Sequence, residues 1–245
     1  NEKDIEIIEG LLEEEARELN RGFFSRIEKN RPFITAKMAT GLDGGIALAS
    51  GKSKWITSSI SREDVHKLRA TNEAILTGTG TILKDDPSLT SRDSGYDNDE
   101  IKQPLIVVVD RSNKLTGNEK IFTQGSKTLT FTSEDSFISS SRNELCVMKK
   151  EDLSNLNKMM QYLANEKSIN TLLVESGSNI FDSLLAEELI DELILYQAPK
   201  LLGKDRHTFS KFNQTSQKLS TIDFKISSIS NLGEDRKVTL IPNYK

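Results

Sequence analysis

Cysteine and histidine are scarce in this sequence. Of its 245 residues, Cys146 is the single cysteine, and His66 and His207 are the only histidines. One cysteine excludes an intrachain disulfide bond, and so few Cys and His side chains make a zinc site hard to build. We therefore predict a protein of the reducing cytoplasm with no bound metal.

Long apolar runs and blocks of like charge are also missing. No stretch approaches the ~20 apolar residues of a membrane-spanning helix, and the acidic opening "NEKDIEIIEG" is unlike a signal peptide. The formal net charge is -4 with no Lys/Arg-rich block, which disfavours nucleic acid as a partner. Because the chain begins at Asn1, we expect a fragment, a trimmed form or a processed product of a longer polypeptide.

The rest of the pattern alternates between strands and helices. Strands are predicted at 33–39, 74–78, 104–110, 171–176 and 192–199, helices at 61–73, 152–166 and 177–190, and a short helical turn at 79–86. The stretches 221–230 and 237–242 predict an antiparallel hairpin around "NLGEDR". The predicted fold class is therefore α/β, with a mostly parallel sheet, helices on both faces and an antiparallel C-terminal hairpin.

Two parts of the chain fit this pattern less well. Residues 1–31 look like an appendage, with a short strand "IEIIE" (5–9) and an amphipathic helix (11–26) whose apolar face carries Leu12, Ala16, Leu19 and Phe23. Residues 111–150 are Ser-rich with only a weak pattern, and we assign no element to them.

Two loops have the composition of ligand-binding segments. The stretch "TGLDGGIALASGKSKW" (40–55) is rich in glycine, which permits a close approach of backbone to a ligand. The stretch "ESGSNIFDSLL" (175–185) puts Gly177 and Ser178 at the start of a helix, where free N–H groups would receive a pyrophosphate. An ordinary strand-to-helix turn is the alternative explanation of the second stretch, because the three-glycine dinucleotide motif is missing.

A third loop, "TGTGTILKDDPSLTSR" (77–92), carries Asp85, Asp86 and Arg92. Paired carboxylates serve as metal ligands or acid/base groups, but they also serve as helix caps and solvated charges. Arg69, on the preceding helix, is likewise either a phosphate contact or a surface charge.

Five stretches in order resemble the reductase domain of the bifunctional riboflavin-biosynthesis pyrimidine deaminase/reductase. They are "KMATGLDGGIALASGKSKWIT", "DVHKLRA", "AILTGTGTILKDDPSLTSR", "LLVESGSNIFDSLL" and "DELILYQAPKLLG". The resemblance implies a dihydrofolate-reductase-like domain over residues 31–245, with residues 1–30 as a remnant of the preceding deaminase domain or linker. The deaminase's zinc motif of His-Ala-Glu and Pro-Cys-x-x-Cys does not occur in the sequence, so we do not expect deamination from this chain.

The resemblance also implies an activity: NADPH-dependent reduction of the ribosyl group of 5-amino-6-(5-phosphoribosylamino)uracil to the ribityl product. Matched motif by motif, the cofactor positions are Ala39, Trp55, Thr81, Asp85, Gly177, Ser178, Asn179, Ile180, Phe181, Asp182 and Ser183. The substrate positions are Ser53, Arg69, Leu89, Arg92 and Glu175, and the candidates for electrostatic or acid catalysis are Asp85, Glu175 and Lys37. Members of the family associate through this domain, so we expect a homodimer.

Gly41, Gly45 and Arg111 are three further residues for which the resemblance gives an expectation. Gly41 and Gly45 depart from the family's usual Ser-Leu-Asp-Gly followed by Arg or Lys, which predicts a more mobile loop with one cation fewer. Arg111, after "VVVD", either binds the 2′-phosphate of NADPH or is a solvent-facing charge.

Two rival functions stay open: a pterin or dihydrofolate-type reductase of the same fold, which would not need a phosphate contact, and a non-catalytic NADPH-binding module.

Overall fold

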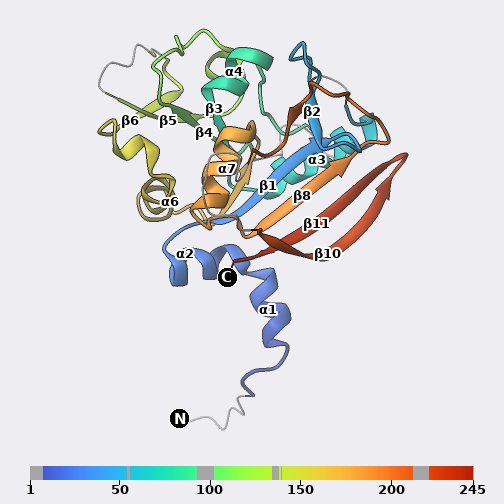
Figure 1. Ribbon diagram of the computed structural model, residues 1–245. Helices are drawn as coiled ribbons and strands as arrows, with labels where there is room; N and C mark the ends of the chain where they lie inside the picture. The colour runs from blue at the N-terminus through green and yellow to red at the C-terminus, as the bar shows by residue number, and fades with distance from the viewer. Residues whose placement is uncertain are drawn as a thin grey trace.

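A single large sheet organises the protein (Figure 1). The computed structural model describes residues 8–53, 56–92, 102–133, 138, 140–211 and 221–244. The sheet has nine strands in the order β10-β11-β8-β1-β7-β3-β4-β5-β6. These are β1 (Phe33–Thr40), β3 (Ala74–Gly78), β4 (Leu105–Asp110), β5 (Thr128–Thr132), β6 (Asn143–Val147), β7 (Thr171–Val174), β8 (Glu192–Gln197), β10 (Asp223–Leu232) and β11 (Asp235–Asn243). The pairs from β8 to β6 are parallel, whereas β10, β11 and β8 pair antiparallel, as predicted.

Helices cover both faces of the sheet, which confirms the predicted fold class. One face packs against α6 (Leu156–Asn165) and α7 (Ser178–Ala186), with Met160 and Leu184 among the fully buried side chains. The opposite face packs against α3 (Ser59–Thr71), α4 (Thr79–Asp85) and α5 (Lys120–Thr123), through residues such as Ile82 and Phe122. Alternate strand residues supply the two layers, because successive side chains of a strand point to opposite faces. Within the described ranges, none of the helices is long and apolar enough to cross a membrane.

Helix α3 is fastened to the C-terminal hairpin at two points. At its start, Ser58 caps the helix by accepting from the Ser61 N–H, and Asp235 accepts from the Ser58 N–H and the Ser61 hydroxyl. Half-way along, Asp64 accepts hydrogen bonds from the Tyr196 hydroxyl and from Lys237. These contacts determine where the rest of α3 lies on the sheet.

The N-terminal segment differs from the single helix predicted at 11–26. It forms α1 (Glu13–Leu19) and α2 (Arg21–Lys29), separated at Asn20, and α1 projects away from the sheet (Figure 1). The predicted apolar face is not buried within the described residues, since Leu12, Leu19 and Phe23 are 63%, 85% and 49% exposed. Helix α2 instead packs closely against β7 at Gly22, where a Cβ would lie only 2.6 Å from the Thr171 side chain. Most of the predicted strand at 5–9 lies outside the described residues.

The stretch 111–150, to which the sequence analysis assigned no element, contains α5, β5 and β6, and η1 (Asp152–Ser154) follows it. Strand β5 is buried on both faces although every second residue is threonine. Its hydroxyls are satisfied by side-chain amides: Thr128 and Thr130 donate to Asn143 Oδ1, and Thr132 donates to Asn113 Oδ1. Polar residues can therefore form a central strand here, since partners on neighbouring segments accept their hydrogen bonds.

Candidate active site

Three predicted site residues meet beside the carboxyl end of β7. Glu175 directly follows β7, and its backbone N–H extends the sheet by donating to the Leu76 carbonyl at 2.9 Å. Lys37, within β1, places its Nζ 2.9 Å from Glu175 Oε2. Arg69, near the end of α3, donates Nε to Oε1 at 2.5 Å and Nη2 to Oε2 at 3.0 Å. This is a two-pronged guanidinium–carboxylate pair with a second cation beside it.

The surroundings keep Glu175 ionised. Its side chain is buried, which alone would raise its pKa, but the charges of Arg69 and Lys37 outweigh burial and hold the pKa well below its usual range. Arg69 is likewise largely buried, and the Glu175 carboxylate raises its pKa against the effect of burial. At neutral pH the cluster therefore consists of one carboxylate and two cations.

Helix α7 begins next to this cluster, at the residues predicted to receive a pyrophosphate. Its N-cap is Gly177, so no side chain caps the N–H groups of the first turn. Among the described residues, apart from Gly177 itself and its two chain neighbours, no atom lies within 4 Å of the place where a Cβ on Gly177 would stand. The first turn also packs against the end of β3, since a Cβ at Gly78 would lie 2.5 Å from Ile180 Cδ1. An open surface with uncapped N–H groups is the geometry that an anion requires.

The later residues of this predicted stretch have other partners. Phe181 is 1% exposed and belongs to the core. Asp182 accepts hydrogen bonds from the Ser210 hydroxyl at 2.5 Å and the Lys211 N–H at 2.9 Å. The Ser183 hydroxyl donates to the Asn179 carbonyl one turn earlier. The open part of this segment therefore lies at Gly177 and the turn that follows it.

Helix α4 brings another pair together. Asp85, its last residue, accepts from the Ser53 hydroxyl at 2.9 Å, and Thr81 lies one turn before it.

Leu89 is only 4% exposed and its side chain packs in the core beneath the loop, with a positive φ of 50°. Ala39, on β1, lies beside Tyr196 of β8. Trp55 lies outside the described residues.

Asp86, the second acid of that loop, is the C-cap of α4 and accepts from the Lys120 backbone N–H at 2.9 Å. Its contact is thus with the start of α5.

Arg111 follows β4 and is exposed. Its Nε donates to the Leu153 carbonyl at 2.7 Å. The preceding Asp110 is buried and shapes the turn, accepting from the Thr79 hydroxyl and from the N–H groups of Lys114 and Leu115. Arg111 is thus anchored at one nitrogen on a well-ordered turn.

The two glycines that depart from the family pattern are sites of close packing. A Cβ at Gly41 would lie 2.6 Å from the Lys200 carbonyl oxygen, and one at Gly45 would lie 2.8 Å from Arg206 Cδ. Asp43 secures the same loop by accepting from the N–H groups of Leu202 and Gly203. We expected these glycines to loosen the loop, whereas the structure uses both to bring two segments together. The two segments also pair as a short ribbon, β2 (Gly45–Ala47) with β9 (His207–Thr208).

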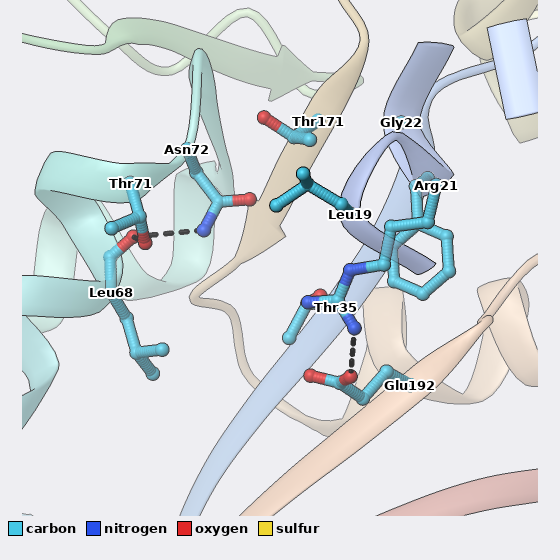
Figure 2. A pocket seen from close by; sticks show the side chains of 10 residues that line it. Leu19, Arg21, Gly22, Thr35, Leu68, Thr71, Asn72, Thr171 and Glu192 are labelled. Atoms are coloured by element: carbon cyan, nitrogen blue, oxygen red, sulfur yellow. Dashed lines mark hydrogen bonds and ion pairs between the residues drawn. The ribbon is translucent and has the colours of Figure 1, made fainter. Parts of the chain in front are cut away.

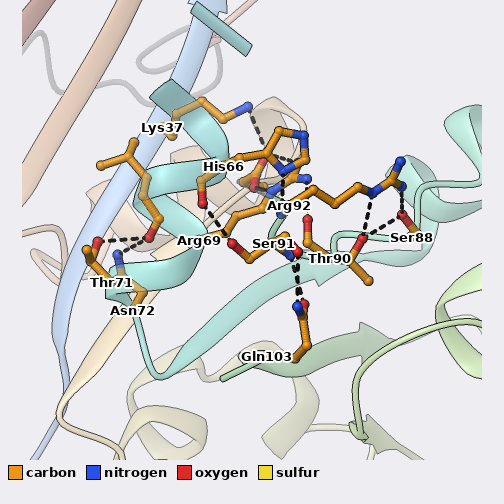
Figure 3. A network of polar contacts seen from close by, with 12 residues as sticks. Lys37, His66, Arg69, Thr71, Asn72, Ser88, Thr90, Ser91, Arg92 and Gln103 are labelled. Carbon is orange, nitrogen blue, oxygen red and sulfur yellow. Dashed lines mark hydrogen bonds and ion pairs between the residues drawn. The ribbon is translucent and has the colours of Figure 1, made fainter. Parts of the chain in front are cut away.

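Arg92 lies in the loop of residues 88–92, which α3 holds (Figure 3). Its guanidinium donates to the hydroxyls of Ser88 and Thr90. Arg69 donates Nη1 to the Thr90 carbonyl at 3.1 Å, so one loop connects the two arginines predicted at substrate positions. His66 and Gln103 also hold this loop, and no sequence pattern indicates them, because their contacts depend on the folded chain.

A separate cavity lies at the amino ends of β1, β7 and β8, where α2 meets the end of α3. It measures about 200 Å³ and is lined by Thr35, Asn72 and Thr171 among others. Figure 2 shows the ion pair that closes one side, with Arg21 Nη1 2.6 Å from Glu192 Oε1. Because ligands of open parallel sheets lie beyond the carboxyl ends of the strands, this cavity is distinct from the candidate site.

Comparison with known proteins identifies the family. The family described as RibD C-terminal domain matches residues 32–238. Riboflavin biosynthesis protein RibD of Escherichia coli (strain K12) is 37% identical, over 94% of this chain and 65% of that protein. The 5-amino-6-(5-phosphoribosylamino)uracil reductase of Buchnera aphidicola subsp. Acyrthosiphon pisum is 31% identical, over 80% of this chain and 99% of that protein.

Solved structures agree with the sequence match. The Thermotoga maritima diaminohydroxyphosphoribosylaminopyrimidine deaminase/5-amino-6-(5-phosphoribosylamino)uracil reductase superimposes with a TM-score of 0.85 at 32% identity, over 98% of this chain and 64% of that one. The chain thus spans about two thirds of the length of these longer relatives. It belongs to the RibD C-terminal domain family.

Proposed function

We propose that this chain is an NADPH-dependent reductase that converts the ribosyl group of 5-amino-6-(5-phosphoribosylamino)uracil to a ribityl group in riboflavin biosynthesis. The observation that carries the proposal is the Lys37–Glu175–Arg69 cluster at the carboxyl edge of the sheet, beside the uncapped start of α7. The name of the Buchnera relative, a 5-amino-6-(5-phosphoribosylamino)uracil reductase of which this chain covers almost all, supports the same reaction.

The start of α7 fits the pyrophosphate of a dinucleotide. Gly177 leaves its surface open, and the first-turn N–H groups have no competing side-chain cap. Ala39, Thr81, Asp85 and residues 177–180 at the open start of α7 would hold NADPH, which supplies a hydride when bound. Arg111, anchored beside β4, would pair with the 2′-phosphate, which NADH lacks.

Arg92, with Ser53 and the backbone near Leu89, would bind the substrate's 5-phosphate. Within the part of the chain that the structure describes, the guanidinium of Arg92 donates to two neutral hydroxyls of its own loop. A phosphate dianion is the stronger acceptor, because hydrogen bonds to ionised groups are about twice as strong as neutral ones. Arg69 would contribute mainly charge, since three of its donors already bind Glu175 and Thr90.

Protonation of the opened, imine-like sugar would fall to Lys37. The reaction adds a hydride and a proton, and the proton needs a donor on the protein. Glu175 is ionised and Arg69 does not release its proton, so Lys37 is the member of this cluster with a transferable proton. Glu175 holds the Lys37 ammonium in place, and Asp85 would orient the substrate through Ser53.

The expected partners extend this proposal. The exposed apolar side chains of α1 and α2, such as Leu19 and Phe23, fit a surface covered by a preceding domain or linker. The hairpin β10–β11 exposes Ile226 and Ile229 and leaves the outer edge of β10 unpaired within the described sheet, which suits a homodimer contact. We propose that the enzyme works as a homodimer in the cytoplasm.

The test is single-turnover oxidation of NADPH with 5-amino-6-(5-phosphoribosylamino)uracil. We expect oxidation of one equivalent of NADPH with formation of the ribityl product, and far less with the dephosphorylated substrate. If NADPH oxidation were equally fast with dihydrofolate, the chain would instead be a pterin reductase. Tight NADPH binding without turnover of either substrate would leave a non-catalytic binding module.

A further inference from the structure

The 88–92 loop is held from two sides (Figure 3). From α3, the His66 carbonyl accepts from the Ser91 hydroxyl at 3.0 Å, and His66 Nδ1 accepts from the Arg92 backbone N–H at 3.2 Å. From the opposite side, Gln103 accepts from the Ser91 N–H and donates to the Ser91 carbonyl, both at 2.9 Å. The backbone that carries Arg92 is therefore fixed between a histidine and a glutamine.

The contact with Arg92 requires a neutral imidazole. Nδ1 accepts a hydrogen bond only through a lone pair, which protonation would remove. Burial, together with the positive charges of Arg69 and Arg92, lowers the pKa of His66. The charged and polar groups that face it are Arg69 from α3 itself, Arg92 and the Thr90 backbone from the loop, and Glu175 from the end of β7. The surroundings thus favour the form that holds the loop.

We propose that His66 is a positioning residue that, as a neutral imidazole, fixes the backbone at Arg92 so that its guanidinium meets the substrate phosphate. The inference rests on the proposed function, because it takes Arg92 as the phosphate contact. His66 itself needs no contact with the reacting atoms. Its effect lies in substrate affinity, because a loop that must be ordered at binding lowers affinity without changing the bound complex.

Two variants of His66 separate this role from general stabilisation. His66→Leu removes the acceptor, and it should raise KM for the phosphorylated substrate by about tenfold, the loss expected for one hydrogen bond, with kcat within about twofold. His66→Asn places an amide oxygen near the position of Nδ1 and should restore KM to within about threefold of wild type. The rate with dephosphorylated substrate should be equal in all three proteins. A role in folding alone would lower the rates with both substrates.

The pH profile is a second readout. His66 has a lowered pKa, so its neutral form persists below the ordinary value near 6.5 and is lost as the pH falls further. The substrate phosphate titrates near pH 6 and affects every variant alike. The KM of wild type should therefore rise more steeply than that of His66→Asn as the pH falls from about 7 to about 5. If the KM of wild type and that of His66→Asn rose equally steeply as the pH fell, the proposal would be overturned.

A binding measurement separates this inference from the proposed reaction. Calorimetric titration with ribose 5-phosphate needs no turnover, and His66→Leu and Gln103→Leu should each weaken its binding about tenfold. An inactive wild type whose ribose 5-phosphate affinity falls in this way would sink the proposed reaction and support the role of His66. An active wild type with unchanged KM and affinity in both variants would overturn the role of His66 and leave the reaction standing.

Discussion

Two clusters of ion pairs lie at opposite ends of the central strands and have the same composition, but only one of them belongs to the candidate site. At the amino end, Asp191 accepts hydrogen bonds from Nη1 and Nη2 of Arg31, the Lys29 ammonium and the Ile34 N–H. At the carboxyl end, Glu175 binds Lys37 and Arg69. Both are nearly buried carboxylates with two cations, and both have a pKa held below the usual range by those cations against the effect of burial.

The difference lies in where the cations come from. Those at the amino end belong to one short segment, residues 29–31, so the cluster fastens that segment to the sheet. Those at the carboxyl end come from β1 and α3, and Arg69 continues to the loop that carries Arg92. A buried ion pair alone therefore does not indicate a functional site. A functional site is indicated when charged residues from distant segments meet beside the open start of a helix.

The largest expected effect is on folding, at the amino end. Asp191→Ala leaves the nearly buried Arg31 without its carboxylate, so we expect the free energy of unfolding to fall by about 3–5 kcal/mol. Urea denaturation measures this loss. The value of kcat/KM per folded molecule should stay unchanged, because the cluster lies away from the candidate site. The matched control is Glu28→Ala in α2, whose pair with Arg17 is half exposed, and its cost should stay below about 1 kcal/mol. A loss of activity in folded Asp191→Ala would break the comparison.

The next effect is on activity, at the carboxyl end. Glu175→Gln keeps the shape of the side chain but removes the charge that orients Lys37 and Arg69. We expect kcat/KM to fall by about a hundredfold, or about 2.7 kcal/mol of transition-state stabilisation. NADPH oxidation at saturating cofactor measures this. A Glu175→Gln protein with full activity and reduced stability would make the two clusters equivalent and remove Glu175 from the site.

How much of this contrast was predictable from the sequence depends on whether each signal is local. The strands β1, β3, β4, β7 and β8 were predicted, because apolar β-branched runs reveal buried strands. Strand β5 was not predicted, because its threonines look exposed until Asn143 and Asn113 are placed beside them. The N-terminal helix was predicted with an apolar face, and the described chain leaves that face exposed, since an amphipathic pattern does not say what covers it.

For the candidate site, too, the sequence indicated individual residues but not the contacts between distant segments. Motifs singled out Glu175, Arg69 and Arg92 as residues, but the pairing of Glu175 with both Lys37 and Arg69 needs the sheet order and the position of α3. His66 gave no signal of its own, because a histidine on a helix is identified as an acceptor for Arg92 only by the folded loop. The family motifs thus named most members of the site, while contacts between distant segments required the structure.

A third prediction uses acid to compare the two carboxylates. A carboxyl with a lowered folded pKa adds stability that is fully present above its unfolded pKa, about 4, and is lost as the pH falls towards the folded pKa. Glu175 and Asp191 should each add up to about 1.4 kcal/mol per pH unit to the acid slope. We expect unfolding free energies measured below pH 4.5 to fall less steeply in Asp191→Asn and in Glu175→Gln, by similar amounts. A slope that changes in one variant only would show that the two environments differ electrostatically.

The smallest expected effect concerns Arg111, a cation near the carboxyl ends that pairs with a backbone carbonyl rather than an acid. Because one nitrogen is anchored on Leu153 and the residue is exposed, solvent screens its charge, and we expect a contribution of about 1 kcal/mol to binding the 2′-phosphate. Arg111→Ala should therefore lower the NADPH/NADH affinity ratio about fivefold, through weaker NADPH binding alone. Titration of both cofactors against wild type and variant measures the ratio. Arg142→Ala is the control, since that exposed arginine donates to the Gly125 carbonyl, and it should leave the ratio unchanged. An unaltered ratio in Arg111→Ala would mean that this cation, like those of the amino end, only holds the chain in place.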